Sequence, residues 1–159
     1  MRRAIWIAVV PIVLIYVVVA YATLDRRSNL DQISALVQQG IQAVQDRNVT
    51  AAVSCISPNY SDDAGFNYDR LRFVLGKAMN SEPDYVLTTS RPVVRTHGDQ
   101  ADVTLHVVVK HPVGAIIYDR DVTLELAKDR SYHMLIIPTR RWLVVGTKNL
   151  GLRNDDSAF

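Results

Sequence analysis

An uncharged stretch runs from Ala4 to Leu24, directly after Arg2 and Arg3, and it constrains the chain more than any other feature. Its residues are almost all aliphatic or aromatic. At about 1.5 Å per helical residue the stretch reaches roughly 31 Å, which matches the hydrocarbon thickness of a bilayer. The sequence therefore predicts a membrane-crossing helix or an export signal, with the lipid bilayer as partner of residues 4–24.

Two alternatives remain open for this segment. Ala20-Tyr21-Ala22 offers the small-x-small site of a cleaved signal, so one alternative is a protein secreted after cleavage near Ala22. Because the apolar stretch is longer than a typical signal core, we expect a retained signal anchor. Residues 1–3 are then a short cytoplasmic tail, residues 4–24 cross the membrane, and residues 25–28 link the anchor to a domain outside the cytoplasm.

Composition narrows the possible functions of the domain. The chain has a formal net charge of +2, which Arg2 and Arg3 supply, because the other basic side chains equal the 16 acidic ones. A nucleic-acid-binding protein needs a basic surface that displaces counterions, so we expect no nucleic-acid partner. The single cysteine, Cys55, cannot form an internal disulfide, and its apolar neighbours predict a buried side chain.

The pattern after the linker predicts two helices. Apolar residues recur at spacings of three and four from Ile33 to Val44, which predicts a helix over residues 29–47 with Ser28 as its cap. Asn48 can cap a second, short helix over residues 49–56, which must end before Pro58.

A third helix follows a loop over residues 58–66. Asn67 and Asp69 mark its start, and Pro83 closes it. Its predicted apolar stripe consists of Leu71, Val74, Leu75, Ala78 and Met79. Three helices thus come before any strand of the domain.

From Tyr85 the apolar period changes to two residues, which is typical of half-buried antiparallel strands. Polar turns at residues 97–100, 111–114 and 128–131 divide the region into four strands of about eight to twelve residues, joined as a meander. Pro138 is expected to bend or split the last strand. The alternation predicts an inner face of Val103, Leu105, Val107, Val122, Leu124 and Leu126 and an outer face with Thr104, His106, Asp121 and Glu125.

This assignment of faces predicts the effect of two substitutions. Leu105→Asp should unfold the domain because it places a charge in the core, whereas His106→Asp should change stability little.

Helices followed by a bent antiparallel meander, in a domain of this size, resemble the nuclear transport factor 2-like cone fold, also called the SnoaL-like fold. The passages that resemble the family are Asp46-Arg47-Asn48, Ser57-Pro58-Asn59-Tyr60-Ser61-Asp62 with Gly65, Gly98-Asp99-Gln100-Ala101 and Trp142-Leu143-Val144. The resemblance covers about residues 29–147. The expected fold class is α+β: a transmembrane helix, then three helices packed on a bent sheet of about four strands, then a disordered tail over residues 148–159.

The resemblance implies several kinds of function, since its members include isomerases, hydrolases, dehydratases, carrier-like binding domains and membrane-tethered scaffold subunits. Its enzymes place acids inside the cone. Tyr60, Asp62 and Asp63 lie in the loop that borders the cone mouth in this family, and a carboxylate beside a phenol can perform acid–base chemistry. His133 is expected on the same face of the last predicted strand as the apolar residues Leu135 and Ile137. These four residues are the candidate catalytic residues.

The apolar inner face favours a function without catalysis. We expect no cofactor, and no metal, because the histidines have no cysteine or carboxylate at ligand spacing. The leading hypothesis is a single-pass membrane protein whose non-cytoplasmic domain contacts a protein partner or a second copy, or holds a small apolar ligand. The alternative is an exported isomerase or hydrolase that acts on a small molecule at the cone mouth.

Overall fold

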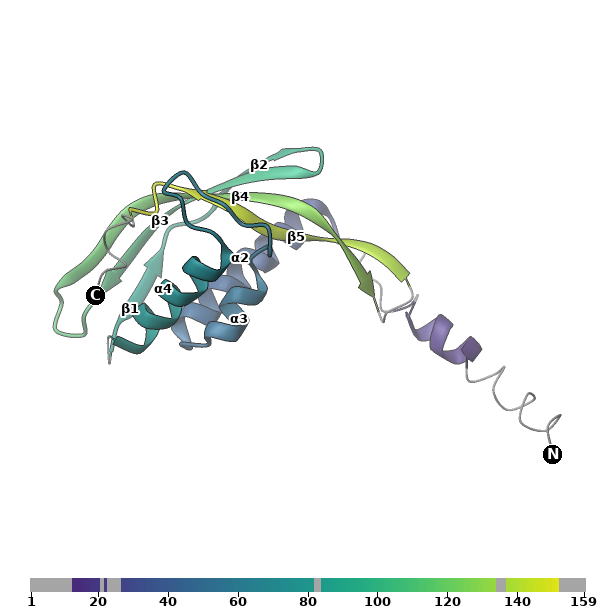
Figure 1. Cartoon of the computed structure of the whole chain (residues 1–159), viewed down its shortest axis with the longest axis horizontal. Helices are drawn as coiled ribbons and strands as arrows, with labels where there is room; N and C mark the ends of the chain where they lie inside the picture. The colour runs from purple at the N-terminus through teal and green to yellow at the C-terminus, as the bar shows by residue number, and fades with distance from the viewer. Residues whose placement is uncertain (1–12, 21, 23–26, 82–83, 134–136, 152–159) are drawn as a thin grey trace, which may run out of the picture.

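The structure, a computed structural model, describes residues 13–20, 22, 27–81, 84–133 and 137–151, with the side chains of residues 131–138 left out. Its fold class is α+β. The elements of the domain are α2 (Asn29–Gln45), α3 (Val49–Ser54), α4 (Tyr68–Ser81), β1 (Val86–Thr89), β2 (Val93–His97), β3 (Gln100–Lys110), β4 (Ile116–His133) and β5 (Ile137–Lys148). The strands form a curled antiparallel sheet, and the three helices lie together on its concave side (Figure 1).

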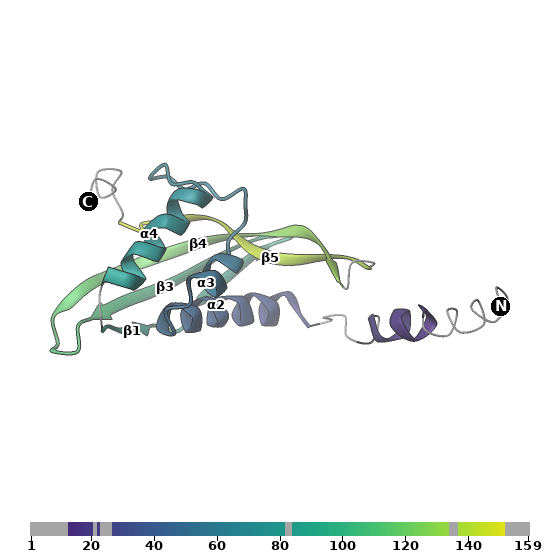
Figure 2. The ribbon, with the colours of Figure 1, turned by 60° about the horizontal axis from the view of Figure 1, so that its bottom comes forward.

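Most of the predicted membrane span lies outside the described residues. Its residues 13–20 are helical and extend away from the domain (Figure 2). Within the described ranges, no helix combines the length and the apolar character that a membrane crossing requires. The apolar side chains of residues 13–19 are open to solvent, with exposed fractions of 53% for Val13, 59% for Leu14 and 63% for Ile15, whereas Ala20 is buried.

The helices begin where the sequence predicts. Ser28 caps α2 by accepting a hydrogen bond from the backbone N–H of Asp31 at 3.2 Å. Asn48 caps α3 in the same way through the N–H of Ala51 at 3.0 Å. Such caps satisfy backbone donors that have no partner inside the helix. Both helices end two residues earlier than predicted, α2 at Gln45 and α3 at Ser54.

The sheet corrects the predicted count of four strands, because it has five within the described residues. The first predicted strand is divided into β1 and β2, which both pair with β3. Proline has no N–H for a strand ladder, so Pro92 interrupts the pairing. Ser90 takes over there: its hydroxyl accepts from the N–H of His106 at 2.9 Å, and its own N–H donates to the carbonyl of His106.

The predicted turn at residues 128–131 is also wrong, because β4 continues through it to His133. These residues pair with the first half of β5 beyond the end of β3, so they belong to a two-stranded ribbon. Polar residues suit such a ribbon because its faces are less covered than those of the main sheet. Pro138 neither ends nor divides β5 and lies within an edge strand, where proline is tolerated.

The predicted inner face of the sheet is confirmed. Val103, Leu105, Val122 and Leu126 are buried. Val107 and Leu124 are partly buried against the same core, which also includes Ile33, Val37, Phe66, Leu71 and Trp142.

The outer face holds a polar cluster in which the ring of His106 lies between two carboxylates, with Nε2 3.1 Å from Asp119 and Nδ1 2.9 Å from Asp121.

After α3 the chain runs along the edge of β5. The N–H of Ser57 donates to the carbonyl of Val144 at 2.8 Å, and the N–H of Val144 donates to the carbonyl of Cys55 at 3.0 Å. Farther along, the N–H of Ser61 donates to the carbonyl of Val145 at 3.0 Å. Gly146 permits this approach, because a Cβ atom there would lie 2.9 Å from the backbone oxygen of Ser61.

The domain extends past residue 148, the predicted start of the tail. Lys148 still belongs to β5, and Leu150 packs against the main core. Asn149 and Gly151 both have positive φ angles, of 60° and 69°, which turn the chain back toward the sheet. Residues 152–159 lie outside the described part.

The burial of Leu105 supports the predicted effect of Leu105→Asp on stability. The contacts of His106 call for a different control variant. Leu105 is 5% exposed, so Leu105→Asp should lower the free energy of unfolding by about 4 kcal/mol or more. His106→Asp would add a third carboxylate between Asp119 and Asp121, so His106→Gln is the better control and should cost about 1 kcal/mol or less. Urea denaturation followed by circular dichroism measures both, and equal losses would contradict the assignment of faces.

Candidate functional site

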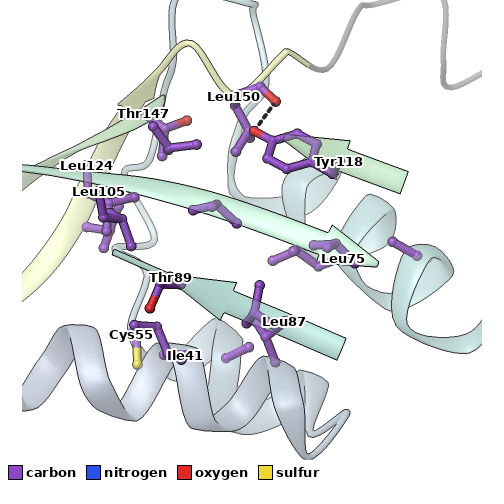
Figure 3. A pocket seen from close by; sticks show the side chains of 18 of the residues that line it. Ile41, Cys55, Leu75, Leu87, Thr89, Leu105, Tyr118, Leu124, Thr147 and Leu150 are labelled. Atoms are coloured by element: carbon purple, nitrogen blue, oxygen red, sulfur yellow. Dashed lines mark hydrogen bonds between the residues drawn. The ribbon is translucent and has the colours of Figure 1, made fainter. Parts of the chain in front are cut away.

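The space between the helices and the concave face of the sheet contains an apolar cavity of about 530 Å³. Residues from α2, α3, α4 and every strand except β2 line it (Figure 3). The lining residues are Leu36, Val37, Gly40, Ile41, Val44, Ala52, Cys55, Ile56, Leu71, Val74, Leu75, Ala78, Met79, Tyr85, Leu87, Thr89, Leu105, Val107, Val109, Ile117, Tyr118, Val122, Leu124, Val144, Thr147 and Leu150. None of them is an acid, a lysine, an arginine or a histidine.

The sequence places these side chains by its two apolar periods. Gly40, Ile41 and Val44 belong to the stripe of α2 that the spacing of three and four predicts, and the stripe of α4 faces them. On the sheet side, alternate residues of β3 and β4 point to the same concave face. A cavity remains because the sheet curls and its helices cover it without filling it.

Most polar groups of the cavity wall already have hydrogen-bond partners in the protein. The hydroxyl of Tyr85 donates to the carbonyl of Val44, and that of Tyr118 donates to the carbonyl of Leu150 at 2.9 Å. The thiol of Cys55 donates to the carbonyl of Ala51 at 3.6 Å, and burial raises the pKa of this thiol. Cys55 is therefore a neutral buried side chain, as predicted, and the wall offers a ligand mainly apolar contact.

The structure brings two of the candidate catalytic residues together. The hydroxyl of Tyr60 donates to Oδ2 of Asp62 at 3.0 Å and lies 2.6 Å from Oγ1 of Thr147. Oδ1 of Asp62 accepts from the backbone N–H of Phe66 at 2.7 Å. Because the Tyr60 proton points to Asp62, the hydroxyl of Thr147 donates to Tyr60. The three side chains form one hydrogen-bonded chain that ends at the cavity wall, where Thr147 lies.

This arrangement holds a loop together. Tyr60 is 2% exposed, and neither Tyr60 nor Asp62 is among the residues that line the cavity. Burial raises the pKa of the Tyr60 hydroxyl above its ordinary value of 10.0, and the charges of Asp62 and Asp63 add to the rise. The phenol is therefore neutral at any physiological pH.

The other candidates lie apart from the cavity. Asp63 is exposed and does not line it. The backbone of His133 ends β4 opposite Ile137, while its side chain lies outside the described part of the chain. In the described ranges, no group of three or more histidine, cysteine or acidic residues is placed to hold a metal.

Several residues of the site could not be found by looking for reactive groups. Gly40 lines the cavity, and a Cβ atom on it would meet no atom within 4 Å, so its missing side chain enlarges the cavity. Leu150 closes one end from beyond the last predicted strand. The parity of β4, which sets Tyr118 on the face of Val122 and Leu124, was the available signal for Tyr118.

Comparison by sequence identifies no relative: no family model matches the chain, and no curated protein does. Solved structures are similar in fold. A cystatin-like fold protein of unknown function from Nostoc punctiforme has a TM-score of 0.58 at 12% identity, over 76% of this chain and 90% of that one. A nuclear transport factor 2-like protein of unknown function from Pseudomonas putida has a TM-score of 0.57 at 13% identity, over 76% and 85%.

A third similar structure, from Streptomyces avermitilis, is described as a candidate dehydratase of the nuclear transport factor 2-like family. It has a TM-score of 0.55 at 12% identity, over 75% of this chain and 93% of that one. Identities this low show the fold alone. The domain therefore has the cone fold of nuclear transport factor 2-like and cystatin-like proteins, and the fold transmits no activity.

The hydrogen-bonded chain at Tyr60 predicts a pH effect on stability. The unfolded chain releases the Tyr60 proton near pH 10.0 while the folded chain keeps it, so the free energy of unfolding should fall above that pH. The contribution of Tyr60 is at most about 1.4 kcal/mol per pH unit. Urea titrations from about pH 9 to about pH 11 should give a shallower decline for Tyr60→Phe, which also loses about 1–2 kcal/mol at neutral pH.

A matched variant separates this effect from general alkaline unfolding. Burial also raises the pKa of Tyr118, so Tyr118→Phe should remove a second, smaller part of the decline, and the double variant should lose both. Identical slopes in all four proteins would contradict the assignment.

Proposed function

We propose that this chain is a membrane-anchored binding protein that holds a small apolar ligand in the cavity of a cone-fold domain outside the cytoplasm. The cavity is the observation that carries the proposal. Its volume of about 530 Å³ falls within the range of about 300–1,000 Å³ that ligand sites occupy. It is also several times larger than an engineered apolar cavity of about 150 Å³ that binds benzene.

Energetics favour an occupied cavity. If the space were sealed and empty, a cost of about 24 cal/mol per Å³ would amount to roughly 13 kcal/mol, as much as the whole stability of a typical domain. Water fills such a space poorly because each molecule needs about two to four polar partners. The polar groups of Tyr85, Tyr118 and Thr147 already have partners in the protein. An apolar ligand is the filling that stabilises this domain most.

The membrane part of the proposal rests on the sequence of residues 4–24. The helical residues 13–20 support it, because a run of exposed aliphatic side chains is costly in water and favourable in lipid. Cleavage near Ala22 is the alternative, and it would leave the same domain in solution.

The second function, an exported isomerase or hydrolase, has less support. Its chemistry would use Tyr60 with Asp62 or Asp63, but none of these residues lines the cavity. The hydroxyl of Tyr60 and the carboxylate of Asp62 bind each other, and Asp62 also holds the backbone of the loop. The candidate dehydratase among the similar structures shares only the fold with this chain, so it does not identify any catalytic residue here.

The anchor is tested by its retention in membranes. After a carbonate wash the full chain should stay in the membrane fraction with its intact mass of 17.8 kDa. Ile15→Arg should reduce this retention, since an arginine near the centre of a span costs about 2.5–3.5 kcal/mol. A mature chain that begins after Ala22 would select the cleaved alternative, and an intact chain released by the wash would exclude both.

The ligand site is tested by blocking the cavity from Gly40. The full chain in nanodiscs would be treated with a long-chain alcohol that carries a photoreactive diazirine, and labelled peptides would be mapped by mass spectrometry. Peptides from α2, α4 and β3 should be labelled. Gly40→Trp, which fills the cavity, should reduce their labelling at least about fivefold while labelling of residues 4–24 stays constant.

Gly40→Ala is the matched control. It should keep the labelling and raise the free energy of unfolding by about 0.5–1 kcal/mol, because alanine stabilises a helix interior relative to glycine. Labelling confined to residues 4–24, or labelling of the domain that Gly40→Trp leaves unchanged, would contradict the proposal.

A further inference from the structure

One cation stands at an end of the otherwise uncharged cavity. Arg120 lies on β4 between Tyr118 and Val122, which both line the cavity, and it pairs in the ladder with Val107, another lining residue. Because residues two apart on a strand point to the same face, Arg120 belongs to the concave side of the sheet. Its side chain is exposed and is not part of the cavity wall, so it stands at the rim.

The rim exists because β5 stops before it reaches the first residues of β4. The pairing between them stops at Thr123 and Lys148, so residues 116–122 of β4 have no strand on that side. Leu150 and Gly151 lie against side chains of this unpaired part of β4. The carbonyl of Leu150 accepts from the hydroxyl of Tyr118, and both residues line the same end of the cavity (Figure 3).

Arg120 packs directly on this segment. A Cβ atom on Gly151 would lie 2.6 Å from Nε of Arg120, so the glycine leaves room for the arginine side chain. Burial raises the pKa of the Tyr118 hydroxyl, and the charge of Arg120 partly offsets that rise, which agrees with their proximity. The guanidinium is therefore held close to Tyr118 and Leu150, which line this end of the cavity, while its own side chain is exposed to solvent.

Arg120 has no acidic partner among the described residues. No ion pair of Arg120 occurs in the part of the chain that the structure describes, and no acidic residue lines the cavity. The acidic neighbours on its own strand, Asp119 and Asp121, belong to the outer face, where both bind His106. Within the described ranges, a positive charge without an acidic partner thus adjoins a cavity that no charged side chain lines.

We propose that the ligand is an amphipathic anion, a free long-chain carboxylate whose chain fills the cavity and whose head binds Arg120. This inference rests on the proposed function, since it needs an apolar ligand in the cavity. An arginine suits the head because its planar guanidinium can bind both oxygens of a carboxylate. Each methylene of the ligand chain that is buried adds to the affinity, so the cavity supplies the affinity and Arg120 selects the charge.

The test compares two photoreactive probes of equal chain length, a diazirine fatty acid and the corresponding alcohol. The full chain would be held in nanodiscs of zwitterionic lipid at low ionic strength, and labelling of the α2, α4 and β3 peptides would be titrated. Arg120→Gln should raise the concentration of acid needed for half-maximal labelling about tenfold and leave that of the alcohol unchanged. Arg120→Lys should restore part of the preference, because it keeps the charge but loses the bidentate geometry.

Lys110→Gln is the control, because Lys110 is an exposed cation at the end of β3 whose parity places it on the outer face. It should change the acid titration little. Equal labelling by acid and alcohol, both unaffected by Arg120→Gln, would overturn the carboxylate inference while leaving an apolar ligand in place. Cavity labelling by neither probe would overturn the proposed function as well, and protection of the cavity by a co-purified phospholipid would assign the site to a two-chain lipid instead.

Discussion

The backbone pairing of residues 55–61 with the edge of β5 is the interaction on which the rest of the domain depends. Its hydrogen bonds, from Cys55 to Ser61 against Val144 and Val145, join the helical layer to the sheet at a fixed distance. They also give the exposed edge of β5 a partner, which an edge strand otherwise lacks. Gly146 makes the approach possible by leaving out a Cβ atom that would meet the backbone of Ser61.

This attachment determines how the candidate residues are used. It brings Tyr60 against Thr147 near the end of β5, and the same loop turns Asp62 toward the N–H of Phe66. A phenol beside a carboxylate thus becomes a structural pair, since both groups have partners and the phenol is buried. The cavity lies on the other side of Thr147, and its character is set by aliphatic side chains from two layers that the curl of the sheet keeps apart.

Local patterns predicted much of this fold. The caps at Ser28 and Asn48 and the faces of β3 and β4 depend on residues near each other in the chain, so the sequence contains them directly. The division of β1 from β2 and the length of β4 depend on which strands become neighbours, and polar residues in a two-stranded ribbon imitate a turn. Such features can be predicted only when the neighbouring strands in the folded domain are known.

The candidate site was harder to predict for the same reason. The proximity of Tyr60 and Asp62 follows from their spacing, but their role depends on Thr147, which lies 87 residues away in the chain. The rim around Arg120 likewise depends on where β5 stops and on how Leu150 folds back. Periodicity places a side chain on a face of a strand, and it does not tell where the neighbouring strand ends.

The cavity also has a consequence for how the domain responds to pressure. Unfolding eliminates internal voids, so a domain with a large void has a smaller volume when unfolded and loses stability under compression. With an empty space of about 530 Å³ the domain should lose stability steeply as pressure rises, and a ligand that fills the space should reduce this loss. The pressure at which the domain unfolds would then report whether the cavity is occupied, without any spectroscopic signal from the ligand itself.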